Sequence, residues 1–254
     1  MSECQNEILF MKPGFDFDKI KFATDKATFK KALELYEKGK VLQFEEEFDG
    51  FSAIVESTQL YNVSIGAKRF GHGDCDCYMG QNDHFCKHAV AVSLFAVLRG
   101  ESLSGDQRKI NVIACCSGEV GILNDAELIS VKQSITLALK YIKSYAGPSR
   151  NWFVYQDSLS EGCGRLSDVV CKLPVSKQTS ELLINLLLRL DKKLCTGGVD
   201  DSDGMVGDFV EEIVSVLEEY TKIDAACAQS FFKLKNRQTC FGWEDPLVKH
   251  LDLL

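Results

Sequence analysis

The stretch CDCYMGQNDHFCKH, residues 75–88, holds three cysteines and a histidine in two pairs, and one residue separates the members of each pair. Cys75 and Cys77 form the first pair, and Cys86 and His88 form the second. Three thiolates and one imidazole are a standard ligand set for a structural zinc ion. Four protein ligands leave no open position for a substrate or a catalytic water. The stretch therefore predicts one structural zinc site.

The residues between and around the two pairs suit such a site. Gly80 lies in the polar linker between the pairs, where it allows the chain to reverse direction. Before the first pair, residues 51–57 and 60–70 alternate in hydropathy and predict two antiparallel strands. After the second pair, the apolar run at residues 89–100 predicts a helix that ends at its last residue, a glycine. The ligands are thus expected between a hairpin and a helix.

Other interpretations of the four residues explain less of the pattern. A redox pair made of Cys75 and Cys77 leaves Cys86 and His88 without a role. An iron–sulfur cluster usually requires four thiolates, and no fourth cysteine lies nearby. The remaining alternative is three buried thiols beside an incidental histidine, which does not account for the spacing.

The pattern C-x-C, a loop of eight residues and C-x-H resembles the SWIM zinc finger. The resemblance covers roughly residues 44–100, and an early finger followed by a helical tail is also similar to small bacterial SWIM proteins. It implies His88 as the fourth ligand in preference to the nearby His72 and His84, because His88 follows Cys86 at the family's ligand position. It also implies a role in protein–protein interaction or DNA binding.

Three basic residues, Lys68, Arg69 and Lys87, lie close to the ligands in the sequence. We expect them mainly to offset the net charge of −1 that three thiolates and a zinc ion leave, and to donate to the sulfur atoms. The alternative is a small basic face, which would contact DNA phosphates rather than base edges. The net charge of −8 disfavours general nucleic-acid binding, so a protein partner is preferred to DNA.

The sequence predicts an α+β fold, in which a small antiparallel sheet and a helix surround a Cys3His zinc site, followed by an all-α helical domain. The expected zinc-finger domain is residues 1–105, with an amino-terminal helix that carries Phe29, Leu33 and Tyr36 on one face. The expected helical domain is residues 106–254. Its predicted helices begin near residues 125, 176, 204, 224 and 245.

Two further segments invite functional interpretations. Residues 145–164 combine aromatic residues, Arg150 and several glycines, and we expect an irregular segment that packs over helices. Residues 197–208 are rich in aspartate but fail the EF-hand pattern at both anchor positions. They predict a turn in which Asp203 or Asp208 stabilises the start of a helix.

The rest of the sequence sets bounds on location and activity. The amino terminus does not resemble a signal peptide, so we expect a cytoplasmic protein whose cysteines outside the site are reduced, mostly buried thiols. No apolar run reaches the ~20 residues of a membrane span. No catalytic motif is recognisable, and enzymatic activity is not expected. The sequence does not predict the oligomeric state.

Overall fold

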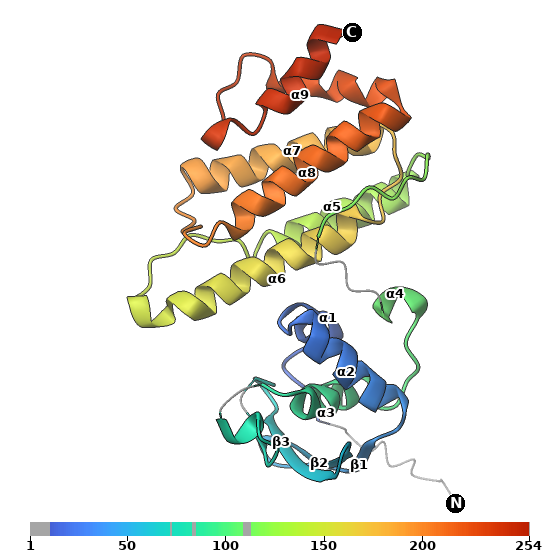
Figure 1. Ribbon diagram of the computed structural model, residues 1–254, viewed down its shortest axis with the longest axis vertical. Coiled ribbons are helices and arrows are strands. Elements are labelled where there is room, and N and C mark those ends of the chain that lie inside the picture. Colours follow the sequence, from blue (N-terminus) through green and yellow to red (C-terminus); the bar gives the residue numbers. More distant parts are fainter. Residues whose placement is uncertain (1–10, 72, 83–84, 109–112, 254) are drawn as a thin grey trace, which may run out of the picture. The chain divides into compact units, whose positions relative to one another are not determined.

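The computed structural model describes residues 11–71, 73–82, 85–108 and 113–253 (Figure 1). The chain divides into two compact units, Met1–Ile110 and Asn111–Leu254, and each has its own hydrophobic core. The first unit contains a sheet and the second consists mainly of helices, which confirms the predicted fold class. No helix in the described part of the chain is both long and apolar enough to cross a membrane.

The sheet of the first unit has four antiparallel strands in the order β1-β2-β3-β4. The strands are β1 (Val41–Glu46), β2 (Gly50–Glu56), β3 (Leu60–Gly66) and β4 (Gly73–Cys75). The predicted hairpin is present as β2 and β3, which pair without a register shift. The short β4 pairs with β3 and brings the chain to the first cysteine pair.

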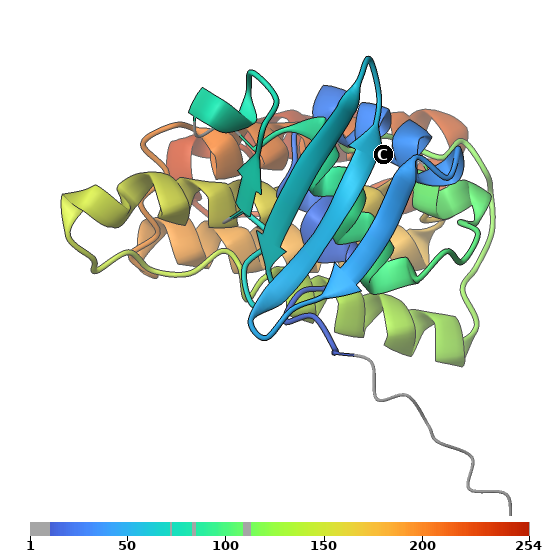
Figure 2. The same cartoon turned by 90° about the horizontal axis from the view of Figure 1, so that it is seen from below.

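The helices of this unit are α1 (Phe17–Phe22), α2 (Lys26–Glu37), α3 (Lys87–Leu98) and α4 (Gly105–Arg108). Helix α3 contacts α2, β2 and β3, and it is buried on nearly all sides. This explains why its sequence is a continuous apolar run rather than an amphipathic one. Figure 2 shows the sheet face-on with α3 behind it, so no helix in the described part of this unit lies over the opposite face of the sheet.

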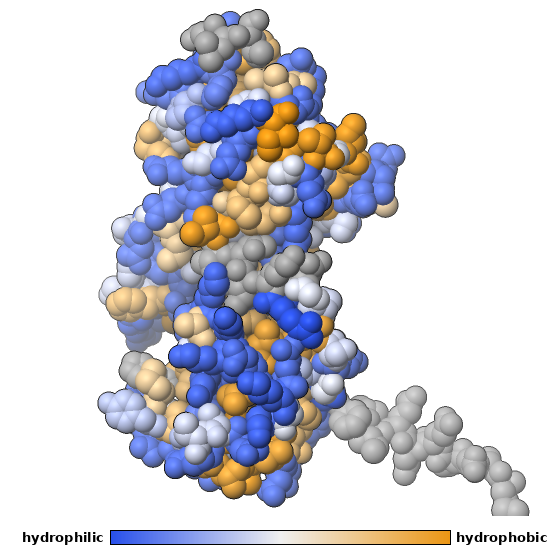
Figure 3. Space-filling view, turned by 45° about the vertical axis from the view of Figure 1, so that its right-hand side comes forward, coloured by the Kyte–Doolittle hydropathy of each residue, from blue (hydrophilic) through white to orange (hydrophobic). Residues whose placement is uncertain are grey.

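The second unit contains α5 (Asp125–Ala138), α6 (Trp152–Val170), α7 (Lys177–Cys195), α8 (Met205–Ile223) and α9 (Asp245–Lys249), with a 3-10 segment at Ala225–Leu234. Helices α6 and α7 each contact α8, and large buried side chains such as Phe209 and Tyr220 fill the core. Figure 3 shows hydrophobic groups among hydrophilic ones on the surface of the chain.

Helix α6 corrects the prediction of an irregular segment at residues 145–164. Gly162 discouraged a helix because glycine costs about 1 kcal/mol in a helix interior. Here it is required, because a Cβ at this position would lie 2.8 Å from Ile142 Cγ1 and 3.1 Å from Tyr141 Cβ. The close approach of α6 to the end of the preceding segment therefore outweighs the helix propensity of glycine.

The aspartate-rich segment precedes a helix, as predicted. The residue whose side chain caps this helix is Asp201, and not Asp203 or Asp208. Asp201 accepts hydrogen bonds from the N–H groups of Val206 and Gly207, each at 2.8 Å. Asp208 lies in the first turn of α8, as expected, whereas Asp203 forms no cap there.

The cysteines outside the zinc finger differ in part from expectation. Cys163 and Cys227 are buried thiols, as predicted. Cys195 and Cys240 form a disulfide, so the prediction of reduced thiols is wrong for this pair. The prediction of buried thiols is also wrong for Cys115, which is exposed, and for Cys116 and Cys171, which are half-buried. Cys4 lies outside the described residues.

Candidate metal centre

The first cysteine pair is placed by the end of the sheet and a tight turn. Cys75 is the last residue of β4 and pairs with Val63 of β3. Two residues later, the Cys77 carbonyl accepts a hydrogen bond from the Gln81 N–H at 2.9 Å, and the Gly80 N–H lies 3.3 Å from Cys77 Sγ. The turn therefore folds the chain under the first pair and directs backbone donors at a ligand sulfur.

The second pair is placed by the start of α3. Cys86 is the N-cap of this helix, and its sulfur accepts from the Ala89 N–H at 3.5 Å. His88 lies in the first turn, and its ring is buried. Cys86 thus caps the helix and presents a ligand at the same time, and the positive end of the helix dipole favours its thiolate.

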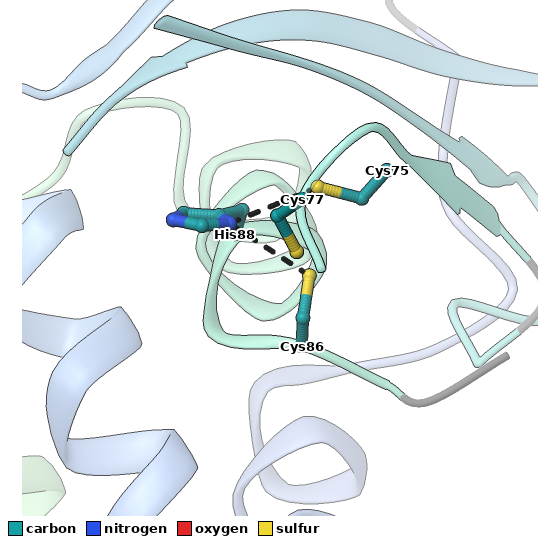
Figure 4. Close-up of side chains that lie close together, drawn as sticks. All are labelled: Cys75, Cys77, Cys86 and His88. Carbon is teal, nitrogen blue, oxygen red and sulfur yellow. Dashed lines mark hydrogen bonds between the residues drawn. The ribbon is translucent and has the colours of Figure 1, made fainter. Parts of the chain in front are cut away.

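The four side chains converge as a tetrahedral zinc site requires. Their ligand atoms all lie within 4.8 Å of one another. His88 Nδ1 lies 3.7 Å from Cys75 Sγ and 3.9 Å from Cys86 Sγ, and Figure 4 shows the sulfur atoms gathered beside the ring. Zn–S bonds of about 2.3 Å and a Zn–N bond of about 2.0 Å at tetrahedral angles separate nitrogen from sulfur by about 3.6 Å. The arrangement is consistent with one structural zinc ion.

Without zinc, the cysteine thiols carry protons that metal binding must displace. The hydrogen bond between the Cys75 and Cys86 side chains lowers the pKa of Cys86, and His88 and the Ala89 N–H assist. The same hydrogen bond, together with burial, raises the pKa of Cys75. Zinc takes the deprotonated form of each cysteine. We therefore expect zinc binding to release the protons that the ligand thiols retain.

The imidazole is oriented by packing. His88 Nδ1 faces the sulfur atoms, whereas the buried Nε2 has no hydrogen-bond partner among the described residues. The ring of Tyr61, on β3, stacks on the imidazole with 4.3 Å between ring centroids and an interplanar angle of 22°. Histidine ligands usually donate their second N–H to a polar group. Here the aromatic stack fixes the ring, a contact that sequence reasoning missed.

The basic residues near the ligands do not donate to the ligand sulfurs, which was one part of the role expected of them. Among the described residues, the backbone N–H groups of Gly80 and Ala89 donate to the ligand sulfurs, and no such contact comes from the three cations. Lys68 and Arg69 are exposed, and Lys87 is half-buried. His72 and His84, the competing imidazoles, lie outside the described residues.

Three buried thiols and one buried imidazole between a hairpin and a helix define a zinc-finger domain with a closed structural site. Residues 61–96 match the family model of the SWIM zinc finger, so this chain carries a SWIM zinc-finger domain. The match spans β3, β4, all four candidate ligands and most of α3. Searches of curated proteins and of solved structures found no significant match.

Replacing Tyr61 by alanine should weaken zinc binding about tenfold, because the imidazole loses the surface that orients it. Replacing Tyr61 by phenylalanine removes only the hydroxyl, which lies 2.8 Å from Thr58 Oγ1, and should leave zinc affinity nearly unchanged. Competition with a chromogenic chelator measures both affinities. Equal affinities for the alanine variant and the original protein would refute a positioning role for the ring.

Replacing Gly80 by alanine should lower the free energy of unfolding of the first unit by about 1–3 kcal/mol. The added Cβ would lie close to the Cys75 carbonyl oxygen and 2.7 Å from Cys75 Cβ, so the turn must open. Denaturant unfolding of the zinc-loaded protein measures the loss. Gly71 is the matched control, because a Cβ there meets no atom within 4 Å, and its alanine variant should retain full stability.

Proposed function

We propose that the SWIM domain is a protein-interaction module whose zinc ion is purely structural. The observation that supports a structural role is the burial of all four candidate ligands, with Cys75, Cys77, Cys86 and His88 only 3–6% exposed. A metal enclosed by four such ligands has no position at which to bind a substrate. The zinc would instead hold β4, its turn and the start of α3 in a fixed arrangement. A non-catalytic role and a cytoplasmic location are parts of this proposal.

DNA binding through the same domain is the second candidate. It is favoured by Lys68 and Arg69, which are exposed and form no ion pair within the described part of the chain. Two or three cations give few phosphate contacts, and the net charge of −8 opposes them. A protein partner is therefore the preferred class.

Selection from a random peptide display library against the intact, zinc-loaded protein tests the proposal. Enriched peptides that bind with a defined affinity, and lose it when zinc is removed, are the expected result. Titration of a fluorescent DNA duplex at rising salt tests the alternative. Tight DNA binding that weakens steeply with salt and is lost in Lys68→Glu/Arg69→Glu, with no peptide enriched, would replace protein interaction by DNA recognition.

A further inference from the structure

The uncovered face of the sheet is hollowed into a groove that extends to the zinc site. One section, of about 720 Å³, is lined by residues of all four strands, including Glu45, Asn62 and Asp76. A second section, of about 610 Å³, continues past Phe85 to the start of α3. Ser64, Asp74, Cys75 and Gly80 line both sections, so the two form one continuous surface. We call it the sheet groove.

Every charged side chain that lines the sheet groove among the described residues is acidic. The carboxylates are Glu45, Glu47, Asp49, Asp74 and Asp76, and all five are exposed. No lysine, arginine or histidine of the described chain lines either section. Cys75 also lines the groove, and it is a candidate ligand of a zinc site whose net charge would be −1. That charge would add to the negative potential of the groove. The groove is therefore a region of one sign of charge, which repels phosphates and attracts cations.

The carboxylates of the groove also differ from others in the same unit by lacking cationic partners. On the neighbouring surfaces, Glu46 pairs with Arg99 at 2.7 Å, and Glu56 pairs with Lys40 at 2.7 Å. None of the five carboxylates in the groove forms an ion pair with a described residue. Among the described residues of the unit, no cation pairs with these carboxylates and no helix covers this face of the sheet.

Two exposed aromatic residues lie close in sequence to the lining residues. Phe48 is fully exposed, at 102%, between Glu47 and Asp49. Tyr78 is 81% exposed and lies two residues before Gly80. An aromatic face beside carboxylates suits the side chains of arginine and lysine, whose cationic groups bind carboxylates and also stack on aromatic rings. The carboxylates carry the inference, and both rings are exposed and so available to such side chains.

We propose that the sheet groove binds a lysine- and arginine-rich segment of a partner protein. This inference rests on the proposed protein-interaction function and specifies the chemistry of the partner. Basic side chains would lie across the strands, with their charged groups at the five carboxylates and their stems against Phe48 and Tyr78. Zinc contributes by holding β4 and the turn at Gly80, which form one wall of both sections.

The test measures the affinity of the full-length, zinc-loaded chain for a fluorescein-labelled peptide of alternating arginine, lysine and serine. A peptide with glutamate in place of each basic residue is the probe control. The double variant Glu45→Gln/Glu47→Gln removes one carboxylate from each section without touching a residue next to a candidate ligand. The double variant Glu34→Gln/Glu101→Gln makes the same change in net charge at exposed sites outside the groove.

We expect saturable binding of the basic peptide at one site, and affinity about tenfold lower in Glu45→Gln/Glu47→Gln. The control variant should bind the basic peptide like the original protein. Neither the original protein nor any variant should bind the acidic peptide. Asp74→Asn, with its zinc content verified, should repeat the loss. Equal weakening in both double variants would reveal general attraction to an acidic chain and overturn the inference. Absence of binding would also overturn it, while peptides selected from the library without basic residues would leave the interaction function standing.

Discussion

Removing zinc should unfold the first unit, and replacing Cys86 by serine should have nearly the same effect. Zinc binding to structural sites contributes on the order of 10 kcal/mol to folding, which is comparable to the whole stability of a typical domain. Cys86→Ser is the sharpest substitution because serine is itself a good N-cap. The start of α3 keeps its cap while the metal loses a ligand, so the variant separates the two roles of Cys86.

Elemental analysis of zinc per chain and the dispersion of amide resonances measure this effect together. We expect about one zinc per chain for the original protein, and little zinc with collapsed resonances of the first unit for the variant. Cys163→Ser is the matched control, because Cys163 is a buried cysteine of the other unit. Replacing His84 by asparagine should leave the zinc content unchanged, and replacing His88 should lower it. The reverse result for the two histidines would show that the ligand assignment is wrong.

Replacing Arg165 by methionine should lower the free energy of unfolding of the helical unit by about 3 kcal/mol. The side chain of Glu161 is 0% exposed, and its Oε1 accepts from Arg165 Nη2 at 2.9 Å and from Nε at 3.1 Å. The guanidinium also lies 4.8 Å from the ring centroid of Tyr141. The substitution takes the arginine away from a buried carboxylate, and this is more costly than the loss of an exposed pair.

A double-mutant cycle separates this effect from lost packing. Glu161→Gln/Arg165→Met removes both charges while conserving most of the volume, and should be more stable than Arg165→Met alone. Chemical denaturation monitored by helical circular dichroism supplies the four free energies. Lys172 is the control, because its exposed side chain pairs with Asp168 four residues earlier. Its methionine variant should change the free energy of unfolding by less than about 1 kcal/mol. If Arg165→Met lowers the free energy of unfolding no more than the Lys172 variant does, the buried pair does not stabilise the unit.

The sequence was sufficient for those parts of the fold that depend on local patterns. The spacing of Cys75 to His88 predicted the cluster, and alternation predicted β2 and β3, because both are properties of neighbouring residues. The contact between Tyr61 and His88 could not be predicted, since it depends on the position of α3 over the sheet. Local rules failed at Gly162, where close packing between two segments required the residue that propensity disfavours.

The sheet groove was beyond prediction for a related reason. Glu45 and Asp74 are distant in sequence and are brought to one surface only by the strand order. The basic residues drew attention because they lie beside the ligands in sequence, yet none of Lys68, Arg69 and Lys87 lines the groove. Proximity along the chain thus offered a small basic face as the alternative to charge compensation, whereas proximity in space favours a cationic partner.

The candidate ligands all lie within the fourteen residues from Cys75 to His88, and this has a consequence for biosynthesis. Nascent chains fold from the amino terminus as they leave the ribosome. The metal site needs no residue of the helical unit, so it can assemble while α5 to α9 are still being translated. Early capture of zinc would also hold the three thiols of the site as metal ligands before the cysteines of the helical unit emerge.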